Sequence, residues 1–225
     1  MNVGLIVAAG KSARMGPTAD KAFLNLGSQP VLAYSVIAYE RCPDIDTIVL
    51  VVRKDRVDSA RAMAKVYGCP KVLNVVAGGS TRQISVANGL DVVSDETRIV
   101  SVHDGARPCV TPLLISETIA VARKHGSGVA AHKITDTVKH VERGVKVTRT
   151  MDRSKLWAVQ TPQTFKLEIL SKAYQFVKKK KLSVTDEAQA VESIDGDVRL
   201  VPAPLSNMKI TCPDDLVLAT TLLGL

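Results

Sequence analysis

Three cations near the N-terminus stand where they could bind a polyphosphate. Lys11, Arg14 and Lys21 follow an apolar segment, Val3 to Val7, that ends at the small residues Ala8-Ala9-Gly10. Small residues let a backbone approach a ligand closely. Exposed backbone N–H groups and fixed positive charges both suit phosphate oxygens. The first hypothesis is therefore a nucleoside triphosphate site at the carboxyl end of the first strand.

This loop matches neither of the two most familiar phosphate-binding motifs. A P-loop carries Gly-Lys and then Ser or Thr after a first glycine and four further residues, and that pattern is absent. The dinucleotide fingerprint needs three closely spaced glycines, which Gly10 and Gly16 do not supply. An ordinary strand-to-helix loop with solvated cations therefore stays open as the alternative interpretation of this stretch alone.

Alternating strands and helices must position this loop. Short, apolar, largely β-branched segments predict strands, and helix signals such as Thr111-Pro112 and Gly126 lie between them. The predicted strands are 3–7, 47–52, 71–76, 98–102 and 128–132, and the predicted helices are 30–41, 55–67, 80–93 and 112–125. This alternation predicts right-handed crossovers and a mostly parallel sheet in a three-layer α/β sandwich.

Three loops follow the carboxyl ends of predicted strands and carry most of the candidate residues. They span 8–21, 78–85 and 103–108. In open parallel sheets, ligands bind outside the carboxyl ends of the strands. We therefore expect these loops, far apart in the sequence, to meet at one edge of the sheet.

The second half of the chain departs from this alternation. Residues 135–150 alternate polar and β-branched side chains around Glu142-Arg143-Gly144, which predicts an antiparallel hairpin. Residues 151–164 are interpreted as a loop, followed by helices at 166–178 and 186–193, a strand at 198–201 and a last helix from Pro213. No repeat or linker divides the chain, so we expect one domain, 1–225, with the hairpin 135–150 as a projecting arm.

Composition narrows the class of protein. The 225 residues carry a net charge of +8, which suits nucleic acid, membrane surfaces or small polyanions. Aromatic residues make up only 4%, so base-stacking platforms are scarce and a nucleic-acid partner is disfavoured. The cysteines and histidines show no metal-ligand spacing, and His103 is interpreted as a loop or core residue. Free thiols, with no signal peptide and no membrane-spanning run, predict a cytoplasmic protein without membrane association.

Seven motifs occur in an order that carries a family resemblance. They are AAGKSARMG with Lys21 after it, GGSTRQISVANGL, VHDGARP, DTVK, TMDRSKLWAVQTPQTF, TDEA and NMKITCPDDL. Together they resemble the 2-C-methyl-D-erythritol 4-phosphate cytidylyltransferases over nearly the whole chain. The resemblance implies a fold like that of the nucleotide-diphospho-sugar transferases. It also implies transfer of CMP from CTP to 2-C-methyl-D-erythritol 4-phosphate, with release of pyrophosphate, in non-mevalonate isoprenoid biosynthesis.

Such a transfer requires positioned cations. The attacking and leaving oxygens both belong to phosphates, so the barrier is mainly electrostatic. The resemblance assigns Arg14, Lys21 and Lys209 to the triphosphate and to the charge that develops at the α-phosphorus. It assigns Asp104 to CTP binding through Mg²⁺ or another divalent cation, which a carboxylate suits. From its spacing alone, Asp104 could instead be a turn residue or an ion-pair partner of Arg107.

The resemblance also implies residues for the two substrates. Those for CTP, beside Asp104, are Ala8, Ala9, Gly10, Gly79 and Ser85, which would read the cytosine through main-chain groups and a hydroxyl. Those for the sugar-alcohol phosphate are Arg107, Thr137, Arg153 and Thr161, where arginine forks suit phosphate oxygens. By spacing alone, Ser85 is an ordinary polar residue at the start of a helix.

A second subunit is the partner that the resemblance implies. In the family the hairpin arm clasps a neighbouring subunit and the arginine at position 153 reaches the neighbour's site, so we expect a homodimer. Two alternatives stay open: a cytidylyltransferase for ribitol 5-phosphate or a related pentitol phosphate, and a nucleotide-binding regulator without turnover. Few aromatic residues argue against a third alternative, a nucleic-acid binder.

The chain departs from the family pattern around the first loop. Ser12 stands where a second loop glycine is usual, and Asp20 and Ala22 flank Lys21 where proline and glutamine are usual. We expect Asp20 to place a carboxylate beside a catalytic cation, which would affect CTP affinity and the rigidity of the loop.

Overall fold

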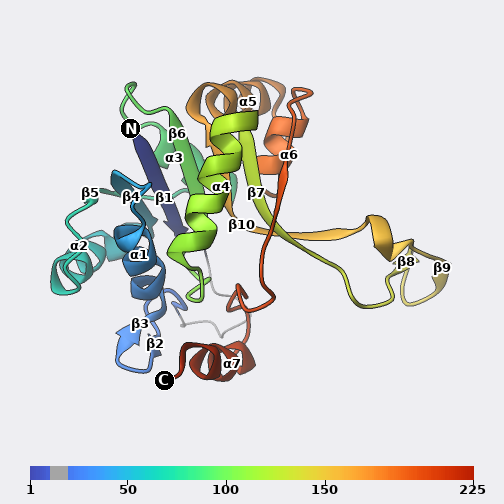
Figure 1. Ribbon diagram of the computed structural model, residues 1–225, viewed down its shortest axis with the longest axis horizontal. Coiled ribbons are helices and arrows are strands. Elements are labelled where there is room, and N and C mark those ends of the chain that lie inside the picture. Colours follow the sequence, from blue (N-terminus) through green and yellow to red (C-terminus); the bar gives the residue numbers. More distant parts are fainter. Residues whose placement is uncertain (11–19) are drawn as a thin grey trace.

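The computed structural model describes residues 1–10 and 20–225. Its central sheet is built from β1 (Asn2–Ala8), β4 (Thr47–Val52), β5 (Val72–Ala77), β6 (Ile99–Asp104), β7 (Ser127–Lys133), β10 (Trp157–Lys166) and β11 (Leu200–Pro202). Within the described residues these strands form one sheet in the order β11-β7-β10-β6-β1-β4-β5. Figure 1 shows this sheet between two layers of helices, which confirms the expected three-layer α/β sandwich.

Helices cover both faces of the sheet (Figure 1). The covering helices are α1 (Val31–Arg41), α2 (Val57–Val66), α3 (Arg82–Leu90), α4 (Pro112–His125), α5 (Leu167–Lys180) and α6 (Glu187–Glu192). Helix α7 (Asp214–Leu223) packs near Leu26 and Val31 instead, and η2 (Lys54–Arg56) and η3 (Arg153–Lys155) are short 3₁₀ turns. One apolar core joins α1, α2 and α4 to the sheet, and a second joins α3, α5 and α6 to its other face. Among the described residues, no helix has the length and apolar character needed to cross a membrane.

Side-chain alternation along the strands explains the two cores. In β1, Val3, Leu5 and Val7 belong to the core with α3, α5 and α6, whereas Ile6 belongs to the other. Successive side chains on a strand point to opposite faces. A strand that is apolar at every position must therefore be covered on both sides, as the sequence predicted.

Most of the sheet is parallel. Strand β1 pairs in parallel with β4 and β6, β4 with β5, and β11 with β7. Strand β10 is the exception, because it lies antiparallel between β6 and β7. The carboxyl ends of β1, β5 and β6 therefore share one edge, where the three loops were expected to meet.

The interpretation of 151–164 as a loop is wrong. Residues 157–166 form β10, a strand near the middle of the sheet, with irregular pairing between Val159 and Gln163. The buried polar side chains in this strand concealed it, because their partners lie on other elements. Gln163 exchanges hydrogen bonds with Asp186 and Ala188 of the α6 region, and Thr164 donates to Ser101 of β6.

Two predicted helix signals can be compared with the structure. Thr111 caps α4 by accepting from the Leu114 N–H at 3.2 Å, and Gly126 ends that helix with a positive φ of 95°, as predicted. Helix α3 is capped by Thr81, whose hydroxyl accepts from the Ile84 N–H at 3.1 Å.

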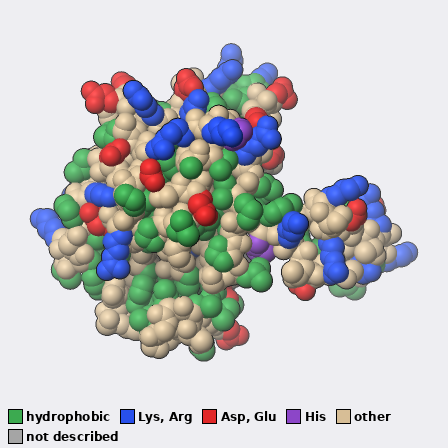
Figure 2. Space-filling view, viewed as in Figure 1, with side chains coloured by type: hydrophobic (Ala, Val, Ile, Leu, Met, Phe, Trp, Pro, Cys, Tyr) green, Lys and Arg blue, Asp and Glu red, His purple; other side chains and the backbone are tan. Residues whose placement is uncertain are grey.

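A two-stranded arm leaves the body of the molecule. Strands β8 (Lys139–Val141) and β9 (Val147–Thr150) pair antiparallel within the segment predicted as a hairpin. Figure 1 shows this arm projecting away from the sheet, and Figure 2 shows lysines and arginines over much of its visible face. A second small ribbon, β2 (Asn25–Leu26) with β3 (Gln29–Pro30), follows the first loop and was not predicted.

Candidate active site

A cavity of about 190 Å³ lies at the carboxyl ends of β1 and β6. Its wall contains six residues that the sequence analysis selected, Ala8, Gly10, Lys21, Ser85, Asp104 and Lys209. It also contains Arg82, which the sequence analysis did not single out although it lies within the GGSTRQISVANGL motif. The fold thus brings together residues as far apart as Ala8 and Lys209 at the predicted edge of the sheet.

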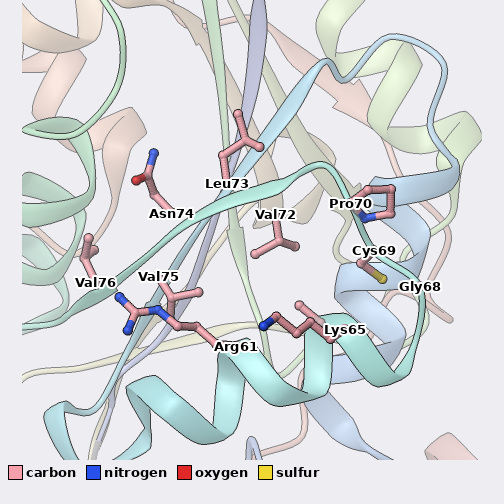
Figure 3. A pocket seen from close by; sticks show the side chains of 11 residues that line it. Arg61, Lys65, Gly68, Cys69, Pro70, Val72, Leu73, Asn74, Val75 and Val76 are labelled. Atoms are coloured by element: carbon pink, nitrogen blue, oxygen red, sulfur yellow. The ribbon is translucent and has the colours of Figure 1, made fainter.

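A larger hollow elsewhere contains none of the selected residues. It measures about 650 Å³ and lies between α2 and the edge strand β5 (Figure 3). Arg61 and Lys65 project from α2 beside Val72 and Val75 of β5. Burial raises the pKa of Cys69 in its wall to about 11, so this thiol stays protonated near neutral pH. Size alone therefore does not identify the site.

Asp104 is the electrostatic centre of the smaller cavity. It is the last residue of β6, and its side chain is 11% exposed. Its Oδ1 accepts from Arg82 Nε at 2.9 Å, and its Oδ2 accepts from Lys209 Nζ at 2.6 Å. Burial alone would raise the pKa of Asp104, but the charges of Arg82 and Lys209 outweigh it and hold the pKa far below the usual value. The carboxylate is therefore ionised throughout the physiological pH range.

Arg82 links the cavity to a buried acid. Both of its terminal nitrogens donate to Glu187, at 2.7 and 2.9 Å, and the Glu187 side chain has no exposed surface. Burial lowers the pKa of Arg82, but the two carboxylates raise it further, so the guanidinium keeps its charge. Glu187 is the first residue of α6 and also accepts from Tyr174 of α5 at 3.0 Å.

Lys21 lies against the C-terminal segment of the chain. Its ammonium donates to the Ile210 carbonyl at 3.1 Å. Ile210 is itself fixed, because its N–H donates to the Ala106 carbonyl at 2.8 Å just beyond β6. The strand-end loop 103–108 therefore positions both lysines, Lys21 through Ile210 and Lys209 through Asp104.

The glycine-rich turn after β5 forms another wall. The Gly79 N–H donates to Ser85 Oγ at 3.1 Å, and that hydroxyl donates to the Thr81 carbonyl at 2.9 Å. A Cβ on Gly78 would lie 2.3 Å from Cβ of Ala9 and 2.7 Å from Ser85 Oγ. A side chain at position 78 cannot fit without moving the first loop, which explains the glycine and brings the two loops into contact.

Two selected residues, Thr161 and Arg107, are buried near Asp104 together with His103. Thr161 is buried in β10, and its hydroxyl accepts from the Asp104 N–H at 3.0 Å and lies 3.1 Å from His103 Nδ1. His103 is fully buried, which confirms the core interpretation, and burial lowers its pKa to about 3. Arg107 is buried and donates to the Asn207 carbonyl at 2.8 Å, and burial also lowers its pKa. Thr161 and Arg107 are therefore engaged within the protein in this structure.

The departures from the family pattern have different outcomes. Ser12 lies outside the described residues, as does the predicted catalytic residue Arg14. The buried Asp20 carboxylate forms an ion pair with Arg56, with its Oδ2 3.3 Å from Arg56 Nε. The Arg56 guanidinium also lies 5.3 Å from the centre of the Phe23 ring. The Asp20 charge is thus balanced by Arg56 of η2.

Two residues selected for the sugar phosphate, Thr137 on the arm and Arg153 in η3 just after it, do not line the cavity. Thr137 and Arg153 are exposed, and Arg153 donates to the Thr135 carbonyl at the base of the arm. The arm projects away from the sheet (Figure 1), whereas the cavity lies at the carboxyl ends of β1 and β6.

Asp104 is the carboxylate that could bind a divalent cation here. Among the residues that the structure describes, no three Asp, Glu, His or Cys side chains gather into a protein-only metal site. Mg²⁺ is often bound by one or two carboxylates together with substrate phosphates. An ionised Asp104 on the cavity wall fits that mode, provided that one of its two cationic partners releases an oxygen.

Known proteins resemble this chain over almost its whole length. The family model described as 2-C-methyl-D-erythritol 4-phosphate cytidylyltransferase matches residues 3–224. A relative with that name from Alkaliphilus oremlandii (strain OhILAs) is 39% identical over 220 residues, 97% of this chain and 93% of the relative. Another from Dehalococcoides mccartyi is 42% identical over 219 residues, 97% of this chain and 94% of the relative.

Solved structures show the same similarity in three dimensions. A 4-diphosphocytidyl-2C-methyl-D-erythritol synthase from Anaerococcus prevotii has a TM-score of 0.87 at 30% identity, and the match covers 100% of this chain and 98% of that one. A 2-C-methyl-D-erythritol 4-phosphate cytidylyltransferase from Francisella tularensis has a TM-score of 0.82 at 30% identity, covering 98% and 99%.

Proposed function

The chain belongs to the 2-C-methyl-D-erythritol 4-phosphate cytidylyltransferase family, and we propose that the cavity beside Asp104 is where it performs the family's reaction. It is a nucleotidyltransferase that transfers CMP from CTP to 2-C-methyl-D-erythritol 4-phosphate in isoprenoid biosynthesis. The products are 4-diphosphocytidyl-2-C-methyl-D-erythritol and pyrophosphate. The observation that carries the proposed site is that Lys21, Lys209 and Asp104 line one cavity in a chain matched from end to end.

The reaction is an in-line displacement at phosphorus. A phosphate oxygen of the polyol forms a bond to the α-phosphorus of CTP, and the bond from that phosphorus to the bridging oxygen breaks. The electron pair leaves with pyrophosphate. Because the attacking phosphate is already ionised near neutral pH, no general base is needed. Catalysis then consists of positioning and of stabilising negative charge.

The proposed roles of the cations follow from their places. Lys21 and Lys209 reach the cavity from opposite ends of the chain and neutralise the charge that develops on the phosphate oxygens. Arg14 keeps the same role as a prediction from the sequence. Arg107 is proposed to bind the polyol phosphate from within its own chain. In this structure one of its terminal nitrogens donates to the Asn207 carbonyl.

The cytidine is proposed to lie between the first loop and the turn after β5. Ala8, Ala9 and Gly10 offer backbone groups without bulky side chains, and the contact of Gly78 with Ala9 brings Gly79 and Ser85 close to them. The Ser85 hydroxyl already orders the turn through Gly79 and Thr81. This turn is therefore preorganised for a base.

Mg²⁺ is the proposed cofactor, with Asp104 as its protein ligand. Held by Asp104, the ion would supply positive charge that neutralises phosphate charge. The chain's own part is to present an ionised carboxylate at the cavity wall. The family resemblance implied that Thr161 contacts the polyol. We propose instead that Thr161 holds Asp104 in place, since its hydroxyl accepts from the Asp104 N–H.

A homodimer is proposed as the active unit. Thr137 on the arm and Arg153 in η3 do not line the cavity of their own chain, so they would contribute to the polyol site of a second subunit. The guanidinium of an arginine can donate two parallel hydrogen bonds to a phosphate. A cytoplasmic location is also proposed, and the free thiols of all four cysteines, Cys42, Cys69, Cys109 and Cys212, support it.

Pyrophosphate release tests the function directly. We expect release when the protein is given CTP, Mg²⁺ and 2-C-methyl-D-erythritol 4-phosphate, and much slower release with ribitol 5-phosphate. Faster release with the pentitol would reassign the substrate. CTP binding without release from any polyol phosphate would favour a regulator and contradict the enzyme.

A further inference from the structure

Arg82 has all three of its nitrogens committed within the protein. Nη1 and Nη2 donate to the Glu187 carboxylate at 2.7 and 2.9 Å, and Nε donates to Asp104 Oδ1 at 2.9 Å. An arginine fork on a carboxylate is a geometrically specific pair and is stronger than a neutral hydrogen bond. Arg82 therefore joins the cavity wall to the helical layer of α5 and α6, which lie side by side in Figure 1.

Glu187 cannot easily release this arginine. Its side chain has no exposed surface, and Tyr174 donates to its Oε1 at 3.0 Å. Removing one member of a buried ion pair leaves an uncompensated charge in a medium that solvates it poorly. The cost of separating Arg82 from Glu187 thus keeps the guanidinium in place when a polyanion enters the cavity.

Lys209 is the other cation on Asp104 and is held less firmly. It contacts Oδ2 at 2.6 Å, and its side chain is 34% exposed. It lies in a segment between β11 and α7 without regular secondary structure. A lysine ammonium is a point charge on a flexible stem, so it can turn from one anion to another without losing a fork geometry.

We propose that Arg82 is a positioning residue that keeps Asp104 in place through Oδ1, whereas Lys209 is the partner that exchanges. When CTP enters, Lys209 turns from Asp104 Oδ2 to a phosphate oxygen. Oδ2 is then the oxygen released for the nucleotide's Mg²⁺. This inference rests on the proposed function, and it distinguishes two cations that contact the same carboxylate. Arg82 acts through Asp104, and Lys209 acts on the nucleotide.

Calorimetric titration with CTP in the absence of any polyol phosphate tests the proposal, because no turnover occurs. Each protein is titrated with EDTA and with saturating Mg²⁺. For Arg82→Lys and Glu187→Gln we expect the gain in CTP affinity from Mg²⁺ to fall by about 10- to 100-fold, as is typical when the partner of a metal ligand is lost. CTP affinity in EDTA should change little.

Arg53→Lys is the matched control. Arg53 forms a similar two-nitrogen pair with Asp55, at 3.0 and 2.9 Å, but on the exposed surface away from the cavity wall. We expect this variant to behave as wild type in both titrations. Thermal unfolding of each variant checks that the fold is intact, and Arg82→Lys provides the test if Glu187→Gln does not fold.

Two results would overturn the inference. A loss of CTP affinity in EDTA as large as the loss in Mg²⁺ would make Arg82 a phosphate ligand. Unchanged Mg²⁺ dependence in both folded variants would show that Asp104 does not need Arg82. Failure of the proposed function has a separate signature, because wild type itself would then neither bind CTP nor release pyrophosphate.

Discussion

At the scale of single residues, the site is a set of charges that are already in place. Asp104 is ionised between Arg82 and Lys209, and Lys21 donates to a backbone carbonyl fixed by the β6 loop. Charges fixed before the reaction need little reorganisation when negative charge develops on phosphate oxygens. Lys21 and Lys209 each have an internal partner that a phosphate can replace, whereas Arg82 stays paired with Glu187.

Lys21→Ala tests the catalytic role of the first loop. We expect kcat to fall by about 100-fold or more, because the lost charge acts most strongly in the transition state. The thermal unfolding midpoint should change little, because Lys21 is only half-buried and lies outside the apolar cores. Lys178→Ala, an exposed lysine near the end of α5, is the control and should keep full activity. An unchanged kcat for Lys21→Ala would remove it from the catalytic residues.

His103 predicts a pH dependence of stability. Burial lowers its pKa from 6.5 to about 3 in the folded protein, so between these values the unfolded chain binds a proton that the folded protein does not. Stability is then lost as the pH falls below 6.5, with a slope of up to about 1.4 kcal/mol per pH unit from this group. We expect urea unfolding between pH 7.5 and pH 4.5 to show a shallower loss for His103→Gln than for wild type. Equal slopes would contradict the assignment.

At the scale of elements, two loops and one strand shape the cavity. The turn after β5 touches the first loop where Gly78 meets Ala9, so the two walls form as a unit. Strand β10 supports Asp104 through Thr161 and fixes the start of α6 through Gln163. The helical layer that contains Glu187 therefore depends on polar contacts of a buried strand.

Arg153→Ala tests the role of the arm. We expect KM for the polyol phosphate to rise about 10-fold or more while KM for CTP stays constant, because an arginine fork on a phosphate contributes about 1.5–3 kcal/mol. Arg149→Ala, which removes another exposed arginine of the arm, is the matched control. A change confined to the KM for CTP would contradict the assignment of Arg153 to the polyol.

At the scale of the whole molecule, the cavity and the arm lie apart. The cavity is at the carboxyl edge of the sheet, whereas the arm projects beyond the body (Figure 1). The arm exposes Val141, Val145 and Val147, and a two-stranded ribbon is marginally stable in isolation. A second copy that packs on the arm would cover these side chains and, by two-fold symmetry, would exchange arm residues between two equivalent sites.

Subunit mixing tests this exchange. Neither Lys21→Ala nor Arg153→Ala should be fully active alone. If each site takes Lys21 from one subunit and Arg153 from the other, a mixed dimer contains one intact site. Random mixing should then restore about one quarter of wild-type activity, since half of the dimers are mixed and each has one such site. No recovery, with mixed dimers demonstrated by mass spectrometry, would show that each chain completes its own site.

Local patterns were sufficient for most of the framework. Strand 47–52 and helix 31–41 carry their own apolar runs and end signals, so they could be predicted from neighbouring residues alone. The order of strands and helices placed the loops at one edge, because parallel strands with crossover helices end on the same side. The family motifs then selected most of the residues that line the cavity.

Only the tertiary structure decided which charges meet. Strand β10 resembled a loop because its buried glutamines and threonines find partners on other elements, and that information is not local in the sequence. Asp104, Arg82 and Glu187 are separated by 22 and 105 positions along the chain, and only the packing of α3 and α6 on the sheet joins them. The sequence by itself indicated the family and the fold class, and it predicted Lys21 and Lys209, but not Arg82, among the cations that line the cavity. The structure determined which carboxylate faces which cation, because ion pairing depends on distances that chain order does not specify.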